Sequence, residues 1–166
     1  LINTNQRGQA LAHSIEIVGA RHLIAGGELA GFLPEAEPFF TVTPQFWIEG
    51  VPPAEAGKEN MSGNLDAALA ASAATSPGRT PRENVRQKDR AYYIYTSGTT
   101  GLPKAANFSH IRMLFMMSGF LGALQPRSSD RIYDTLPLYH ATGGVCAVGM
   151  ALCRGGALIL KKRFSV

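Results

Sequence analysis

The chain has 166 residues, of which 45% are apolar and 17% are charged, and its formal net charge is +4 at pH 7. This length and composition are typical of a globular protein with a buried core and exclude wholesale disorder. Most basic residues are scattered, whereas a nucleic-acid site requires a face of cations with interleaved aromatic residues, so no nucleic-acid partner is predicted.

Residues 1–74 are predicted to form a segment of βαβ type. A strand-like start leads into a helix that Asn5 caps and Gly19 ends, and a buried strand follows at 23–25. Strand, helix and strand at this spacing imply parallel pairing. The glycine pair after the second strand lacks the G-x-G-x-x-G spacing, so it predicts a turn into a short helix and not a dinucleotide site.

Two more elements complete this first segment, a strand at 46–48 and an alanine-rich helix at 64–74. Residues 75–91 are polar and contain two prolines, which predicts an exposed connection. The remaining segment, 92–166, begins with an aromatic and β-branched run that is typical of a strand.

Strands and helices alternate through this last segment. The predicted elements are strands at 92–95 and 104–108, a helix at 110–124, a strand at 130–136, a helix at 145–152 and a buried strand at 157–160. This alternation predicts an α/β fold with an open, mostly parallel sheet flanked by helices. Ligands bind such sheets beyond the carboxyl ends of the strands.

The stretch between the strands at 92–95 and 104–108 is the most informative part of the sequence. It holds only Thr, Ser and Gly until Leu102, and it closes with Lys104. Backbone N–H groups, hydroxyls and a lysine suit a bound anion, while a flexible linker is the alternative. A Walker loop needs four residues between its glycines, but Gly98 and Gly101 are separated by two, so this is a different phosphate loop.

The run from Tyr95 to Lys104, Tyr-Thr-Ser-Gly-Thr-Thr-Gly-Leu-Pro-Lys, closely resembles the AMP-binding signature of the acyl-adenylate-forming superfamily. Within that superfamily, the chain is most similar to the branch of fatty acid transport proteins and very-long-chain acyl-CoA synthetases. The closer likeness rests on residues 1–8, 93–95, 105–106, 134–140, 143 and 161–165.

The resemblance implies an ATP-dependent ligase that activates a long- or very-long-chain fatty acid, first to an acyl-adenylate and then to an acyl-CoA. ATP, Mg²⁺ and coenzyme A are the implied cofactors and co-substrates, and the fatty acid is the implied partner. The implied contacts to the ATP phosphates are Thr96, Ser97, Gly98, Thr99, Thr100, Gly101 and Lys104. Thr96 is also implied to help bind Mg²⁺.

A second small-residue turn runs from Leu138 to Gly144, and its Tyr139-His140 pair matches a family motif that borders the acyl and adenylate pocket. From the residues alone, a strand-end aromatic followed by a capping histidine explains it equally well. The resemblance assigns Tyr139, His140, Gly143 and Gly144 to the substrate pocket, and Lys104 and His140 to the catalytic set. Proton transfer by His140 is not inferred, because no partner carboxylate can be placed near it.

The resemblance also implies that the chain is part of a larger N-terminal domain, with the C-terminal domain absent. The family's adenine-binding motif with its Mg²⁺-binding glutamate, its ribose-binding aspartate and its C-terminal lysine have no counterpart before Val166. We therefore expect these 166 residues alone to be inactive. Two alternatives stay open: another carboxylic-acid–CoA ligase of the superfamily, or a membrane-associated fatty acid uptake protein.

Cys146 and Cys153 lie within an apolar stretch, which predicts two buried, reduced thiols and no zinc site. Reduced thiols without a signal peptide predict a cytoplasmic protein. The apolar runs at 113–124 and 145–153 are too short to span a bilayer, although peripheral membrane contact stays open. The oligomeric state is unknown from the sequence.

Overall fold

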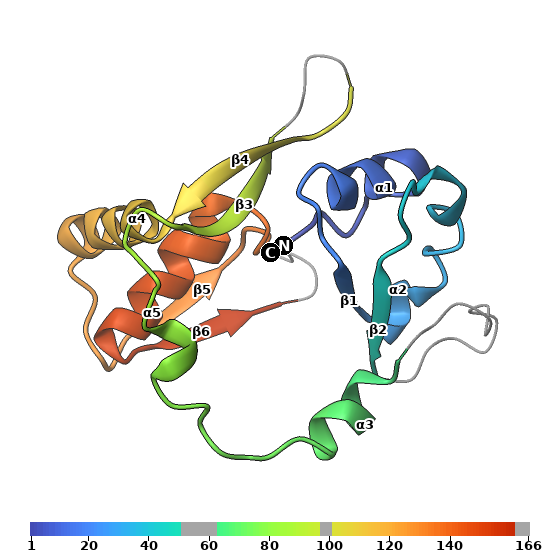
Figure 1. Cartoon of the computed structure of the whole chain (residues 1–166). Coiled ribbons are helices and arrows are strands. Elements are labelled where there is room, and N and C mark those ends of the chain that lie inside the picture. Colours follow the sequence, from blue (N-terminus) through green and yellow to red (C-terminus); the bar gives the residue numbers. More distant parts are fainter. Residues whose placement is uncertain (51–62, 97–100, 162–166) are drawn as a thin grey trace. The chain divides into compact units, whose positions relative to one another are not determined.

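A computed structural model describes residues 1–50, 63–96 and 101–161 (Figure 1). The chain divides into two compact units. The amino-terminal unit comprises Ile2–Glu83 and Thr96–Ala105, and the carboxy-terminal unit comprises Leu1, Asn84–Tyr95 and Ala106–Val166. The two units are described separately below.

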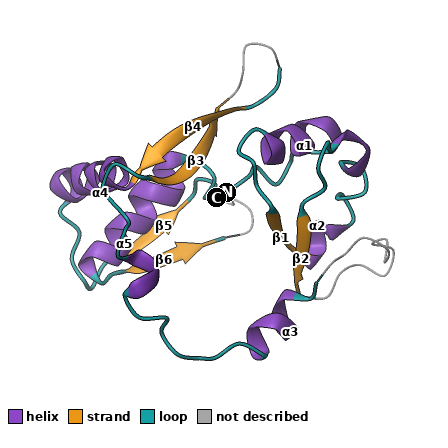
Figure 2. Cartoon of the chain, viewed as in Figure 1, coloured by secondary structure: helices purple, strands orange, loops and turns teal. Residues whose placement is uncertain are grey.

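The amino-terminal unit is built around two parallel strands (Figure 2). Its elements are α1 (Gly8–Glu16), β1 (His22–Gly26), α2 (Gly27–Ala30), a 3₁₀ turn (Glu37–Phe39), β2 (Gln45–Glu49), α3 (Leu65–Ala70) and a second 3₁₀ turn (Thr80–Arg82). The register of the strand pair runs from His22 opposite Gln45 to Gly26 opposite Glu49. The predicted turn into a short helix after β1 is confirmed by α2.

The core of this unit joins α1 to the strands. Leu11 and Ile15 lie one turn apart on α1 and are buried, and Phe46 and Ile48 alternate along β2 with more exposed neighbours. The full buried cluster is Leu11, Ala12, Ile15, Ala25, Ala30, Leu33, Ala36, Phe46 and Ile48. The backbone of α1 is therefore held by packing on the side that faces this cluster.

The start of the chain differs from the prediction. Residues 1–3 form no strand, and the parallel pair is β1 with β2. Asn5 does not cap α1, because the Asn3 side chain accepts a hydrogen bond from the Asn5 N–H and forms a turn that delays the helix. Gly19 does lie just after the helix, with a φ of +62° that suits glycine.

The carboxy-terminal unit holds the second group of elements. They are β3 (Arg90–Thr96), β4 (Lys104–Ser109), α4 (His110–Leu124), β5 (Arg131–Asp134), a π-helix (Thr142–Ala147), α5 (Val148–Arg154) and β6 (Ala157–Leu160). β3 pairs with β4, and β5 pairs in parallel with β6. The division between the units passes through β3 and β4, whose loop-side residues belong to the amino-terminal unit.

The predicted α/β class with parallel pairing is confirmed, although the described strands form three separate pairs. As predicted, Ser109 caps α4, with its hydroxyl accepting from the Arg112 N–H at 3.4 Å. Ile94, Phe108, Met117 and Val145 form the buried cluster that joins β3 and β4 to the helices. β6 was predicted to be buried, but its end residues are exposed, because in the described structure it pairs only with β5.

The two cysteines do not share one environment. Cys146 is fully buried, as predicted, but Cys153 is exposed in the last turn of α5, beyond the buried residues of that helix. Burial raises the pKa of the Cys146 thiol. A raised pKa leaves a smaller fraction of reactive thiolate at any given pH. The inaccessibility of Cys146 and its raised pKa therefore both slow chemical modification of this thiol.

Alkylation of the native protein at mildly alkaline pH is therefore expected to modify Cys153 and to spare Cys146. Peptide mass spectrometry before and after unfolding measures the two modification rates. Unfolding should equalise them, and Cys153→Ser should remove native-state labelling of that peptide. Equally fast labelling of both cysteines in the native protein would contradict the burial of Cys146.

Candidate functional site

β3 and β4 carry the residues on either side of the predicted phosphate loop. Thr96 is the last residue of β3 and Lys104 is the first residue of β4, and both are exposed. Because the two strands pair, the Thr96 hydroxyl and the Lys104 side chain flank one loop. Ser97, Gly98, Thr99 and Thr100 lie outside the described residues.

The carboxyl end of this loop depends on a glycine. Gly101 has a φ of +86°, in the left-handed region where a side chain causes strain. Leu102 and Pro103 follow and are half-buried before β4 begins. The geometry thus explains why the second glycine of the signature precedes Leu-Pro-Lys.

One contact at this loop was not anticipated. The Nε2 atom of His13, on α1, lies 3.0 Å from the carbonyl oxygen of Pro103. Both residues belong to the amino-terminal unit. The two residues lie 90 positions apart in the chain, so no local sequence pattern links them.

Strand β3, which leads into the loop, contains the partly buried residue Tyr95. Burial, and to a lesser extent Tyr93, raises the pKa of the Tyr95 phenol, so Tyr95 remains protonated at neutral pH. Tyr95 is half-buried directly before the exposed Thr96. Tyr95 thus adds no charge beside Thr96, and the basic residue Lys104 lies at the other end of the loop.

The Tyr139-His140 turn follows β5 in the carboxy-terminal unit. Asp134 ends the strand, and its Oδ1 accepts the Leu136 N–H at 3.0 Å. The His140 N–H donates to the Pro137 carbonyl at 3.0 Å, and the rings of Tyr139 and His140 are 4.9 Å apart. Tyr139 is half-buried and His140 is exposed, so the turn presents an accessible imidazole.

Gly143 and Gly144 were predicted to end a small-residue turn, but they lie within the π-helix. A Cβ atom at Gly143 would lie 2.7 Å from the Pro137 carbonyl oxygen, and one at Gly144 would lie 2.0 Å from that of Leu138. Glycine at both positions lets the helix pack against the backbone of the preceding turn. π-helical turns occur frequently at functional sites.

Asp134 supplies a further observation at this turn. The residue is 8% exposed, and its Oδ2 has no hydrogen-bond partner within the described ranges. A buried carboxylate oxygen without a partner costs free energy, so such atoms call for an explanation. The nearby Leu136 N–H satisfies only Oδ1.

Among the residues that the structure describes, no group of three or more His, Cys, Asp or Glu side chains is placed to hold a metal ion. Mg²⁺ at nucleotide sites keeps waters and substrate phosphates as ligands and needs few protein oxygens. The exposed Thr96 hydroxyl is compatible with that accessory role.

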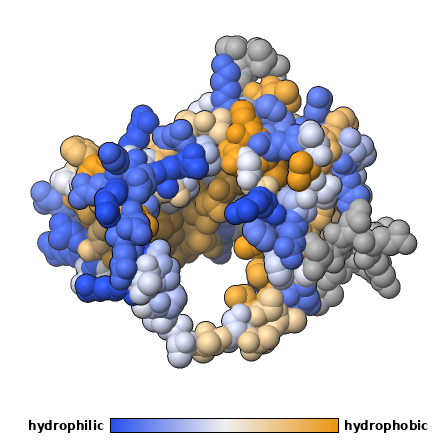
Figure 3. All heavy atoms as spheres, in the orientation of Figure 1, coloured by the Kyte–Doolittle hydropathy of each residue, from blue (hydrophilic) through white to orange (hydrophobic). Residues whose placement is uncertain are grey.

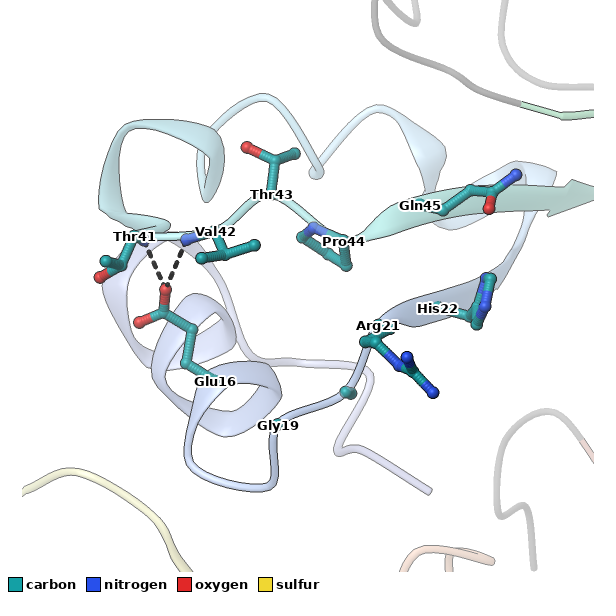
Figure 4. Close-up of a pocket in the computed structure, with 10 residues that line it drawn as sticks. Glu16, Gly19, Arg21, His22, Thr41, Val42, Thr43, Pro44 and Gln45 are labelled. Atoms are coloured by element: carbon teal, nitrogen blue, oxygen red, sulfur yellow. Dashed lines mark hydrogen bonds between the residues drawn. The ribbon is translucent and has the colours of Figure 1, made fainter.

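A separate pocket of about 860 Å³ lies in the amino-terminal unit (Figure 4). It opens where β1 and β2 begin, and its lining includes Arg21, His22 and Gln45. The Glu16 carboxylate accepts hydrogen bonds from the backbone N–H groups of Thr41 and Val42. Because ligands of parallel sheets bind at the opposite, carboxyl edge, and no predicted site residue lines this pocket, we assign it no role.

The surface of α4 exposes several apolar side chains. Figure 3 shows hydrophobic residues, in orange, on the surface of the molecule. Leu114, Phe115 and Leu124 are at least half exposed. Within the described ranges, no helix combines the length and the apolar character required to cross a membrane.

Comparison with known proteins gives a consistent result. The family model described as "AMP-binding enzyme" matches residues 1–166. Human long-chain fatty acid transport protein 1 is 36% identical over 168 residues, covering 99% of this chain and 25% of the relative. The medium/long-chain-fatty-acid–CoA ligase FadD6 of Mycobacterium tuberculosis is 33% identical over 170 residues, covering 99% of this chain and 26% of the relative.

The fold matches a solved structure. The inhibitor-bound N-terminal domain of FACL13 from Mycobacterium tuberculosis superposes with a TM-score of 0.73 and 24% identity, covering 99% of this chain and 37% of that one. The chain spans about a quarter of the length of the two curated relatives.

Proposed function

Because the chain belongs to the AMP-binding enzyme family, we propose that it is part of the N-terminal domain of an AMP-forming fatty acid–CoA ligase. The observation that carries this proposal is the phosphate loop between the paired strands β3 and β4, with Gly101 in the left-handed region and Lys104 exposed at its exit. The substrate we propose is a long- or very-long-chain fatty acid, as the names of the relatives suggest.

In the proposed reaction, a fatty acid carboxylate oxygen attacks the α-phosphorus of ATP and pyrophosphate leaves. The thiolate of coenzyme A then attacks the acyl carbon, and AMP leaves. Loop N–H groups and the Lys104 ammonium would hold the triphosphate while its charge is redistributed. We assign the phosphate contacts to Thr96, Ser97, Gly98, Thr99, Thr100, Gly101 and Lys104.

Mg²⁺ would neutralise part of the phosphate charge when bound. We propose that the Thr96 hydroxyl lies among its oxygen ligands, since it is exposed at the end of β3 beside the loop. Its single oxygen cannot form a site alone, so the phosphates and waters would supply the other ligands.

We assign the Tyr139-His140 turn to the fatty acid side of the pocket. The tilted ring pair and the exposed imidazole can position a carboxylate, and Gly143 and Gly144 hold the turn close to the helix. His140 serves here as a hydrogen-bond donor to the substrate. It is not proposed to transfer a proton.

Fatty-acid-dependent exchange of pyrophosphate into ATP tests the first half-reaction. The full-length protein that carries this chain should show exchange with long-chain acids, and a panel of carboxylic acids would identify its preference. Exchange that needs no acid would contradict the proposal. Exchange only with aromatic or other short acids would retain the ligase and reject the proposed substrate.

A second candidate function, fatty acid uptake at a membrane, is suggested by the name of the human relative and by the exposed apolar face of α4. Co-sedimentation with phospholipid vesicles separates the two. We propose that the ligase is cytoplasmic. Strong binding to vesicles without acid-dependent exchange would favour the uptake function over the ligase.

A further inference from the structure

His13 and Pro103 form a long-range contact at the end of the phosphate loop. Proline has no N–H, so its carbonyl oxygen is the only hydrogen-bonding group on its backbone, and this oxygen can only accept. The His13 Nε2 atom lies 3.0 Å from it and must therefore carry the proton. The contact is a directed N–H···O hydrogen bond.

The donor residue, His13, lies on a helix that packs against the core. His13 lies on α1 between Ala12 and Ser14, which are 1% and 0% exposed. The Ser14 hydroxyl also donates to the Gln6 side chain at 2.7 Å, which ties the helix to the segment that precedes it. The core of the amino-terminal unit therefore holds the His13 backbone in place.

The acceptor controls the residue that follows it. No cis peptide bond occurs in the described backbone, so the Pro103 carbonyl and the Lys104 N–H point in opposite directions across one planar unit. A hydrogen bond that holds the carbonyl consequently sets the orientation of the Lys104 backbone. The proline ring and the left-handed Gly101 restrict the remaining backbone freedom on the other side.

We propose that His13 is a positioning residue for the described segment Gly101–Lys104. Its Nε2–H holds the Pro103 carbonyl and thereby aims Lys104 at the triphosphate. This inference rests on the proposed function, because it assumes that Lys104 contacts ATP. The proposal adds a residue of α1 to the proposed phosphate contacts, which otherwise lie between Thr96 and Lys104.

The test compares His13→Ala with His13→Gln in the full-length protein, using acid-dependent pyrophosphate exchange. We expect His13→Ala to raise the apparent KM for ATP about five-fold, as the loss of one hydrogen bond predicts, with the KM for the fatty acid unchanged. His13→Gln should restore most of the affinity, because its side-chain amide can donate at a similar reach. A residue that only stabilises the fold would not produce this division between the two substrates.

His22→Ala is the matched control. His22 lies on β1 in the same unit, and its Nδ1 accepts a hydrogen bond from the Trp47 indole at 3.2 Å. We expect its kinetics to match the wild type. An unchanged KM for ATP in His13→Ala, or equal losses for both substrates in the alanine and glutamine variants, would overturn the proposal.

Amide hydrogen exchange tests the His13–Pro103 hydrogen bond without an enzyme assay. Peptides covering residues 101–109 should exchange faster in His13→Ala than in wild type and His13→Gln, while peptides of β1 and β2 should not change. Unchanged exchange at 101–109 would overturn the positioning role. If residues 101–109 exchange faster in His13→Ala but the wild type shows no acid-dependent pyrophosphate exchange, the proposed function is wrong. The role of His13 in ordering residues 101–109 is then still supported.

Discussion

Replacing Lys104 by alanine is expected to lower kcat/KM for acid-dependent pyrophosphate exchange by about two orders of magnitude, the usual cost of removing one preorganised group that stabilises transition-state charge. Lys104 is exposed at the first position of β4, directly after the loop, so its ammonium is free to reach a bound triphosphate. Initial rates measured over a range of ATP concentrations would give the loss.

Two matched variants distinguish this effect from a general loss of positive charge. Lys88→Ala removes a lysine from the exposed connection and should leave exchange unchanged. Lys104→Arg keeps the charge on a different head group and should retain an intermediate rate. Full exchange in Lys104→Ala would remove the loop lysine from the proposed mechanism.

Replacing Gly144 by alanine is expected to destabilise the protein by about 1–3 kcal/mol, the typical cost of forcing an extra methyl group into a packed site. The new Cβ would lie 2.0 Å from the Leu138 carbonyl oxygen, which belongs to the backbone and cannot rotate away. The turn that carries Tyr139 and His140 must then shift, so acid-dependent exchange should fall together with stability. Urea unfolding and exchange kinetics measure the two effects.

Gly122→Ala is the control for this substitution. Gly122 lies within α4, and the described structure leaves open space within 4 Å of a Cβ built there. Alanine in a helix interior is favoured over glycine, so this variant should gain about 0.5–1 kcal/mol. A stable, fully active Gly144→Ala protein would show that the π-helix does not press against the turn.

The elements with the strongest local signals were predicted well. The aromatic run before Thr96 forms β3, the residues from Lys104 form β4, and Ser109 caps α4. Each depends on neighbours a few positions apart: β-propensity, a loop of small residues, or a cap and the N–H three residues later. Family membership was predicted for the same reason, because the signature around the loop is one continuous stretch.

Where competing local interactions existed, the predictions failed. Asn5 resembled a cap, but the Asn3 side chain bonds to its N–H and the helix starts at Gly8. Gly143 and Gly144 were predicted to end a small-residue turn, but they belong to a π-helix that packs against the backbone of the preceding turn. A local sequence pattern cannot decide between a helix cap and a side-chain turn, or between a turn and a π-helix, because the choice depends on where neighbouring atoms lie in the folded structure.

By itself, the sequence determined the α/β class, the family and the two strands that flank the predicted phosphate loop, because these follow from residues adjacent in the chain. The tertiary structure alone decided that β1 pairs with β2, that Cys153 is exposed, and that His13 holds Pro103 from 90 positions away. These last features arise from contacts between distant segments, which exist only once the hydrophobic core has packed α1 and the strands together.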